Sequence, residues 1–137
     1  MRVIVSAERD ERRIDIRAAL EALCSGIPAP AIRLAIADDL HITAPDTAHT
    51  LFCCVQEAIT NAVRHAHAGL IAIDITRCDD LIVASVADDG RGRAGSGDGN
   101  GLSGMRERLA QHGGSMTAGD APGRGFRIDL RLPVARA

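Results

Sequence analysis

Four polar side chains fall on one side of a long predicted helix, residues 47–66. At about 100° per residue, Glu57, Asn61, Arg64 and His65 lie within an arc of about 100°. The adjoining arc is apolar, so that side must pack on other elements and leave the polar group at its edge. An amide oxygen at that edge suits Mg²⁺, which takes oxygen ligands and keeps several waters alongside phosphate. The alternative is an ordinary amphipathic helix with a solvated polar face.

A second group of residues follows an apolar stretch, residues 81–87, which runs directly into Asp88 and then into Gly90 and Gly92. A carboxylate at the end of a strand can accept a hydrogen bond from the exocyclic amine of a nucleobase. The glycines allow a flat base to approach the backbone closely. Guanine presents a carbonyl where adenine has this amine, so such a carboxylate would discriminate between them. The alternative is an acidic turn between two elements, and we expect Asp89 to be solvated.

The third group is a glycine-rich segment, residues 99–104, which fits the G-x-G-x-x-G pattern of dinucleotide-binding domains, with Asp120 at a suitable distance. That fingerprint must follow a strand directly, whereas a loop intervenes here, and the rest of the chain is too short for a complete βαβ domain. We interpret residues 93–98 as a flexible lid and the segment after it as the N-terminus of a helix. Free N–H groups at such a terminus can bind phosphate.

In this order and spacing, the three segments resemble the N, G1 and G2 boxes of the GHKL ATPases. Residues 101–108, Gly-Leu-Ser-Gly-Met-Arg-Glu-Arg, resemble the pattern of bacterial sensor histidine kinases, in the class that partners helix-turn-helix response regulators. The resemblance covers essentially residues 14–133. It implies an α+β fold of the Bergerat type, a two-layer α/β sandwich with a mixed, mostly antiparallel sheet and helices packed on one face.

The resemblance also implies a role for each matching residue, with ATP and Mg²⁺ as ligands. Asn61 would be the Mg²⁺ ligand, Arg64 would contact a phosphate, and His65 would line the ribose or phosphate region. Glu57 would orient or deprotonate the phosphoacceptor histidine, and Asp88 would accept from the adenine amino group. The residues that would shape the base slot and bind the phosphates are Gly90, Gly92, Gly99, Gly101, Leu102, Gly104 and Met105.

Other positions depart from the family pattern or leave two interpretations open. Phe126 stands where the family usually has Thr, so a contribution near the phosphates would be lost or replaced. Arg106 and Arg108 would either reach phosphate or pair with Glu107 on the helix surface.

None of the five histidines lies in a preceding helix of the kind that carries the phosphoacceptor in these kinases. We therefore expect a catalytic domain that transfers the γ-phosphoryl group to a histidine on a dimerisation domain outside this sequence. That domain would lie in the same parent protein or act in trans, with a response regulator downstream.

Apolar periodicity predicts three helices, at residues 14–24, 47–66 and 102–112, the last beginning at Leu102 or Ser103. It predicts five strands, at residues 32–36, 70–76, 81–87, 115–118 and 126–132. Because seven of the fourteen glycines fall within residues 90–104, this stretch is predicted as a loop. We expect an N-terminal segment, residues 1–13, which is the remnant of a preceding region, and one domain, residues 14–137.

The composition excludes several classes of protein. All sixteen residues counted as Lys or Arg are Arg, so a Walker A loop, a Schiff base and a pyridoxal-phosphate site are excluded. A net charge of −2 argues against nucleic-acid binding. No apolar run approaches the roughly 18 residues of a membrane helix, and the first residues are too short a stretch for a signal peptide. We expect a cytoplasmic protein with no membrane contact, monomeric as an isolated domain.

The four cysteines form no C-x-x-C pair, which argues against zinc, and we expect buried, reduced thiols.

Three other functions stay open. An anti-sigma-factor serine kinase would share the fold but act on a protein hydroxyl. A non-catalytic module would bind ATP and regulate a partner through its lid. A plain structural α+β domain would bind no nucleotide.

Overall fold

The computed structural model describes residues 15–38, 40–42, 44–65, 69–90, 100–120 and 125–134. The elements, in order along the chain, are α2 (Ile16–Ser25), β1 (Ala31–Ile36), α3 (Pro45–His65), β2 (Leu70–Cys78), β3 (Leu81–Asp88), α4 (Asn100–Gln111), β4 (Ser115–Asp120) and β5 (Phe126–Pro133). Of the helices in these ranges, none combines the length and the apolar character needed to span a membrane.

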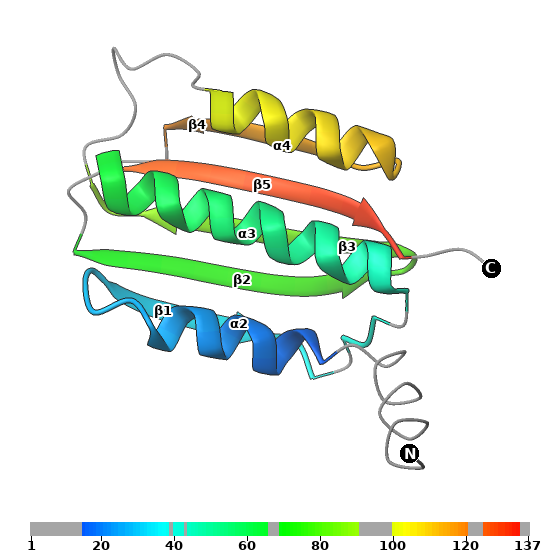
Figure 1. Ribbon diagram of the computed structural model, residues 1–137, viewed down its shortest axis with the longest axis horizontal. Helices are drawn as coiled ribbons and strands as arrows, with labels where there is room; N and C mark the ends of the chain where they lie inside the picture. Colours follow the sequence, from blue (N-terminus) through cyan, green and yellow to red (C-terminus); the bar gives the residue numbers. More distant parts are fainter. Residues whose placement is uncertain are drawn as a thin grey trace, which may run out of the picture.

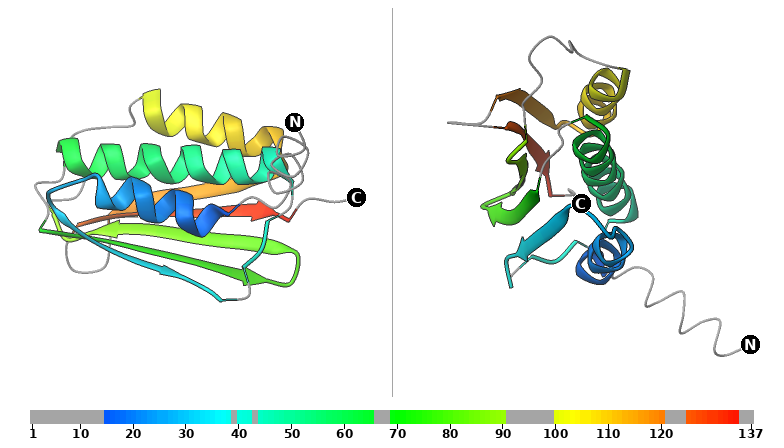
Figure 2. Two further views of the ribbon diagram at one scale, coloured as in Figure 1. Left: turned by 60° about the horizontal axis from the view of Figure 1, so that its bottom comes forward. Right: turned by 90° about the vertical axis from the view of Figure 1, so that its left-hand side faces the viewer.

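The five strands form one mixed sheet in the order β1-β2-β3-β5-β4. Strand β1 runs parallel to β2, and the other neighbouring pairs are antiparallel. The helices α2, α3 and α4 lie side by side on one face of this sheet, with α3 in the middle (Figures 1 and 2). This arrangement confirms the predicted two-layer α/β sandwich with a mostly antiparallel sheet.

The core lies between the two layers because the central strands bury every second residue on the side that faces the helices. In β3 every second residue is buried, and in β2 the side chains of Ile71, Ile73 and Ile75 are at most 1% exposed. They belong to one core with Leu51 and Val55 of α3, which recur at helical spacing. Each such side chain contributes about 1.5–3 kcal/mol when fully buried.

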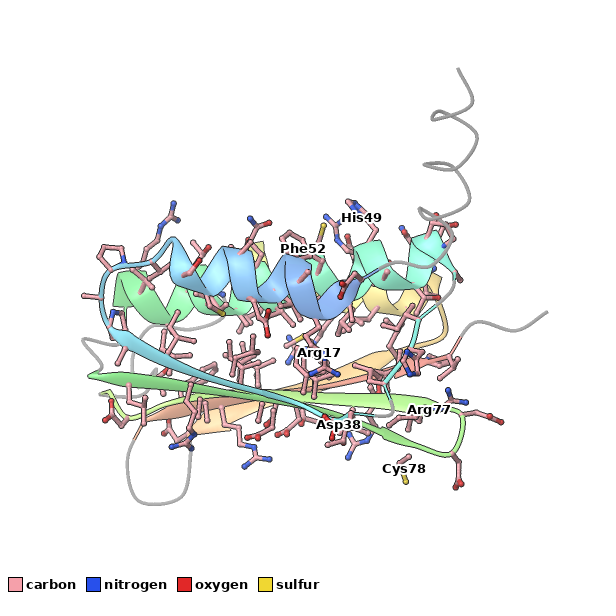
Figure 3. All side chains as sticks on the ribbon, turned by 90° about the horizontal axis from the view of Figure 1, so that it is seen from below. Arg17, Asp38, His49, Phe52, Arg77 and Cys78 are labelled. Atoms are coloured by element: carbon pink, nitrogen blue, oxygen red, sulfur yellow. The ribbon has the colours of Figure 1, made fainter. Side chains whose placement is uncertain are left out.

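The first helix is capped and anchored by two polar side chains. Asp15 accepts a hydrogen bond from the Ala18 N–H at 3.0 Å, so α2 begins at Ile16, two residues later than predicted. Arg17 reaches from α2 to the end of β1, where its guanidinium donates to the carbonyl oxygens of Ile36 at 3.1 Å and Ala37 at 2.9 Å (Figure 3).

The prediction of a loop over residues 90–104 is wrong at its C-terminal end, because α4 already begins at Asn100. Each helical glycine costs about 1 kcal/mol relative to alanine. However, Leu102, Met105 and Leu109 are at most 3% exposed, and their spacing of three and four residues requires a helix. Their burial therefore outweighs the glycine cost.

The C-terminus of α4 is closed by glycine. Gly113 has φ +79°, in the left-handed region that favours glycine, and the Gly114 N–H donates to the Leu109 carbonyl at 2.7 Å. A Cβ atom on Gly114 would lie 2.5 Å from the Arg131 carbonyl oxygen. The helix end therefore approaches β5 too closely for any other residue.

The cysteines differ in burial, so the prediction that all are buried is wrong. Cys54 is buried, Cys24 and Cys53 are half-buried, and Cys78 is exposed. Cys78 is exposed because β2 continues past the core into the hairpin with β3.

We expect iodoacetamide to alkylate Cys78 first and Cys54 only after unfolding. Burial raises the pKa of the Cys54 thiol to about 11, so the thiol stays protonated and inaccessible at neutral pH. Tandem mass spectrometry of tryptic peptides over a time course measures both rates, with fragmentation separating Cys54 from Cys53 in the peptide that they share. Equal rates in native buffer would contradict the burial of Cys54.

Candidate functional site

One end of the sandwich brings together the three segments singled out in the sequence. The C-terminal end of α3, the N-terminal end of α4 and the end of β3 lie on the same side of the molecule (Figure 1). Strand β3 is antiparallel to both β2 and β5, so its last residue, Asp88, lies opposite Ile71 at the start of β2 and next to the start of β5.

At this end of the sandwich, the acidic residue Asp88 is buried and only 7% exposed. Its Oδ1 accepts the Gly90 N–H at 2.8 Å, and its carboxyl also accepts the Phe126 N–H. Burial raises the pKa of Asp88 above its ordinary value, the two backbone donors oppose this shift, and the charge of Asp89 adds to it. Because a carboxylate offers about four lone-pair sites, it can still accept from a ligand amine.

Gly125 allows β5 to approach Asp88. It has φ +97°, and a Cβ atom there would collide with the Asp88 carbonyl oxygen and lie 2.8 Å from its carbonyl carbon. The next residue, Phe126, thereby delivers its N–H to the Asp88 carboxyl. This contribution of Phe126 comes from the main chain and needs no hydroxyl. Gly125 was not among the predicted site residues, and the only signal was its position before a strand.

Asp89 is exposed, as expected, and its carboxylate also accepts hydrogen bonds from the backbone. Its Oδ1 accepts the N–H groups of Gly69 at 2.8 Å and Leu70 at 3.0 Å, at the start of β2. Sequence reasoning missed these bonds because the partners lie about twenty residues away.

The polar residues of α3 do not all face the same neighbour. Glu57 and Arg108 of α4 both act on the buried Cys54 thiol, whose pKa is raised chiefly by burial, lowered by Arg108 and raised further by Glu57. Glu57 therefore lies on the side of α3 that faces α4. Asn61, half-buried and one turn further along, lies on the same side.

Arg64 is exposed and lines a cavity of about 430 Å³ with residues of the connection after α2, including Ile27 and Pro28. On the helix it lies only about 20° from Glu57, so its side chain borders this cavity from the polar side of α3. Its predicted phosphate contact stays a prediction. His65 ends α3, but its side chain is outside the described part of the chain.

The residues of the glycine segment divide into three groups. Leu102 and Met105 lie in the hydrophobic core. Gly104 is exposed on α4, with no atom within 4 Å of an added Cβ, and Gly101 also lies in α4. Gly92, Gly99 and the predicted lid, residues 93–98, lie outside the described residues.

The cavities between α2 and α3 are poor candidates for a phosphate site. The cavity that contains Arg64 is otherwise lined mainly by apolar and backbone atoms. A second cavity, of about 260 Å³, includes His49 and Phe52, which lie on the outer side of the helical layer (Figure 3). The second cavity lies across α3 from Glu57, and the first borders Arg64 from the apolar connection after α2. The candidate site therefore remains the end of the sandwich at Asp88.

Comparison with known proteins decides the family. Residues 46–136 match the family model described as "Histidine kinase-, DNA gyrase B-, and HSP90-like ATPase". The chain belongs to this family. The match confirms the resemblance found in the three motifs.

The similar proteins are sensor histidine kinases. The chain is 36% identical over 90 residues to the sensor histidine kinase YxjM of Bacillus subtilis, covering 66% of this chain and 22% of that protein. It is 38% identical over 101 residues to YvfT of the same organism, covering 73% and 27%. The chain thus spans about a quarter of the length of these relatives. These relatives do not favour the alternative functions of a serine kinase or a non-catalytic ATP-binding module.

Solved structures share the fold. The ATP binding domain of PrrB from Mycobacterium tuberculosis has a TM-score of 0.66 and 22% identity, and covers 90% of this chain and 97% of that one. The histidine kinase AdeS from Acinetobacter baumannii has a TM-score of 0.75 and 17% identity, and covers 90% and 67%. At these identities, the likeness shows the fold alone.

Proposed function

We propose that this chain is the ATP-binding catalytic domain of a two-component sensor histidine kinase. It binds Mg²⁺–ATP and transfers the γ-phosphoryl group to a histidine on a dimerisation domain, with a response regulator as the downstream partner and the cytoplasm as the compartment. The observation that carries this proposal is the buried Asp88 carboxylate, held by the Gly90 and Phe126 N–H groups at the end of the fold where α3 and α4 meet β3.

Asp88 is suited to bind the adenine of ATP. Its carboxylate is desolvated and held in one orientation by backbone donors, and it has lone pairs left for the adenine amine. Gly90 is buried beside it without a side chain that could occupy a base slot. Guanine would leave the carboxylate unpaired, so the site should prefer ATP.

The facing parts of α3 and α4 are suited to bind the phosphates of ATP and Mg²⁺. The first N–H groups of α4 have no partner within the helix, and the helix dipole favours an anion there. Asn61 offers an amide oxygen from the side of α3 that faces α4, and Glu57 lies one turn earlier. When bound, Mg²⁺ neutralises phosphate charge. The residues of the chain orient the nucleotide, which is the main protein contribution to phosphoryl transfer.

Asn61→Ala is expected to remove most of the Mg²⁺ dependence of ATP binding, about tenfold or more in Kd, because loss of an oriented oxygen ligand weakens the metal. Calorimetric titration of ATP with and without Mg²⁺ measures the effect, with GTP as the nucleotide control. Gln56→Ala is the matched variant, since Gln56 is an exposed amide of the same helix. An unchanged Mg²⁺ dependence in Asn61→Ala would remove Asn61 from the site.

The kinase proposal itself is tested by adding a separately produced dimerisation domain of a sensor-kinase relative, with radiolabelled ATP. Phosphorylation that is lost in acid and lost on replacing the acceptor histidine supports the proposal. ATP binding without transfer would support a non-catalytic module, and acid-stable label on a hydroxyl would support a serine kinase.

A further inference from the structure

We propose that Asp89 is a positioning residue of the nucleotide site, which fixes Gly69 and the start of β2, the strand that follows α3 in the chain, and so sets the distance between Asn61 and Asp88. This inference rests on the proposed function, because it assigns Asp89 a part in Mg²⁺–ATP binding without contact to the nucleotide.

The carboxylate of Asp89 replaces a backbone acceptor. The ladder between β2 and β3 has Ile71 opposite Asp88, so Leu70 lies opposite Asp89. The Asp89 N–H donates to the Leu70 carbonyl at 3.3 Å, as expected for the next pair of an antiparallel ladder. The return bond, from the Leu70 N–H at 3.0 Å, goes to Oδ1 of the Asp89 side chain. The side chain therefore extends the pairing beyond the end of β3.

The same oxygen holds the residue before β2. Oδ1 of Asp89 accepts the Gly69 N–H at 2.8 Å, and the Gly69 carbonyl accepts the Ala31 N–H of β1 at 3.3 Å. Gly69 is thus joined to the starts of two strands and, through Asp89, to the end of a third. Both N–H groups, of Gly69 and Leu70, bond to the one oxygen Oδ1, so the position of this oxygen fixes the start of β2.

The anchored point lies just after the helix that carries the proposed metal ligand. α3 ends at His65, four residues before Gly69, and Asn61 lies in its last turns. Asp88, the proposed adenine acceptor, is the residue next to Asp89. Asp89 therefore ties together two elements that must bind opposite ends of one nucleotide. A misplacement of about 1 Å in such a constellation can cost on the order of a hundredfold in activity.

The test compares three substitutions that separate acceptor position from charge. Asp89→Asn keeps an oxygen in place and removes the charge, Asp89→Glu keeps the charge and displaces the oxygen by one methylene, and Asp89→Ala removes both. We expect Mg²⁺–ATP affinity within about twofold of wild type for Asp89→Asn and about tenfold weaker for the other two. Calorimetry measures affinity, and hydrogen exchange at the Gly69 and Leu70 amides reports the local bonds. Asp80→Ala, in the exposed turn at the far end of β3, is the control.

Each outcome decides the inference. Rapid exchange at Gly69 and Leu70 with unchanged ATP affinity would mean that the bonds are structural only and would overturn it. Weaker binding in Asp89→Asn with wild-type affinity in Asp89→Glu would also overturn it, because charge rather than position would then matter. If Asp89→Ala does not fold, the other two substitutions still give the answer. A wild-type chain that binds no ATP would instead overturn the proposed function, and the inference with it.

Discussion

Asp88→Asn is expected to weaken ATP binding by about 10- to 100-fold and to abolish the preference for ATP over GTP, since a hydrogen bond to a charged group contributes about 1.5–3 kcal/mol. The asparagine oxygen can keep the Gly90 N–H, which Oδ1 of Asp88 accepts at 2.8 Å. The new amide NH₂ is a donor and cannot accept from the adenine amine. The substitution therefore changes recognition with little change in shape.

Calorimetric titration of ATP and GTP measures this effect, with Asp80→Asn as the matched control at the other end of β3. Asp80 is exposed in the hairpin turn, so its substitution should leave both affinities unchanged. A preserved preference for ATP in Asp88→Asn would contradict the adenine role.

Asp88→Asn is expected to weaken ATP binding but not to lower the stability of the folded chain. Burial raises the pKa of Asp88 in the folded chain above its ordinary value of 3.8, so the folded state holds this proton more tightly than the unfolded chain does. The resulting stabilisation is present below pH 3.8 and is lost as the pH rises through the raised pKa. Without nucleotide at pH 7, Asp88→Asn is therefore expected to be at least as stable as wild type in urea, with an advantage that shrinks toward pH 3.8. A lower stability at pH 7 would show that the charge of Asp88 is needed for folding.

Gly125→Ala is expected to lower the free energy of unfolding by about 3 kcal/mol or more, and to abolish ATP binding. The left-handed φ of +97° disfavours any residue with a Cβ, at about 1–2 kcal/mol. The added methyl group also collides with the Asp88 carbonyl oxygen and lies 3.1 Å from the Asp89 Cα, and such overpacking costs about 1–3 kcal/mol. Relief requires β5 to move away from β3, which removes the Phe126 N–H from the Asp88 carboxyl.

Urea unfolding followed by far-ultraviolet circular dichroism measures the loss. Gly119→Ala in β4 is the control, because nothing lies within 4 Å of a Cβ there and its φ is not in the left-handed region. An unfolding midpoint for Gly125→Ala equal to that of wild type would show that β5 does not press on the end of β3 as described.

The sequence predicted the helices and strands well, because the spacing of apolar residues that marks each of them involves only neighbouring residues. The alternation of Ile71, Ile73 and Ile75 could only be a strand with one buried face, and the helical recurrence of Leu51 and Val55 required a buried helix face. The predicted strands differ from the observed ones by at most two residues at either end. The largest error was the start of α4, where local glycine content was outweighed by burial of Leu102 and Met105 against the rest of the core.

The sequence by itself determined the family, the order of the elements and the end of β3 as the place for a recognising carboxylate, because these depend on residue types at short spacing. The tertiary structure decided what surrounds that carboxylate. Gly125, Gly69 and Leu70 meet Asp88 and Asp89 only because β5 and β2 flank β3, and no local pattern encodes that adjacency. It likewise decided that Arg64, although only about 20° from Glu57 on the helix, borders a cavity on the α2 side. A helical spacing fixes which residues share a face, but packing against neighbouring elements determines what that face contacts.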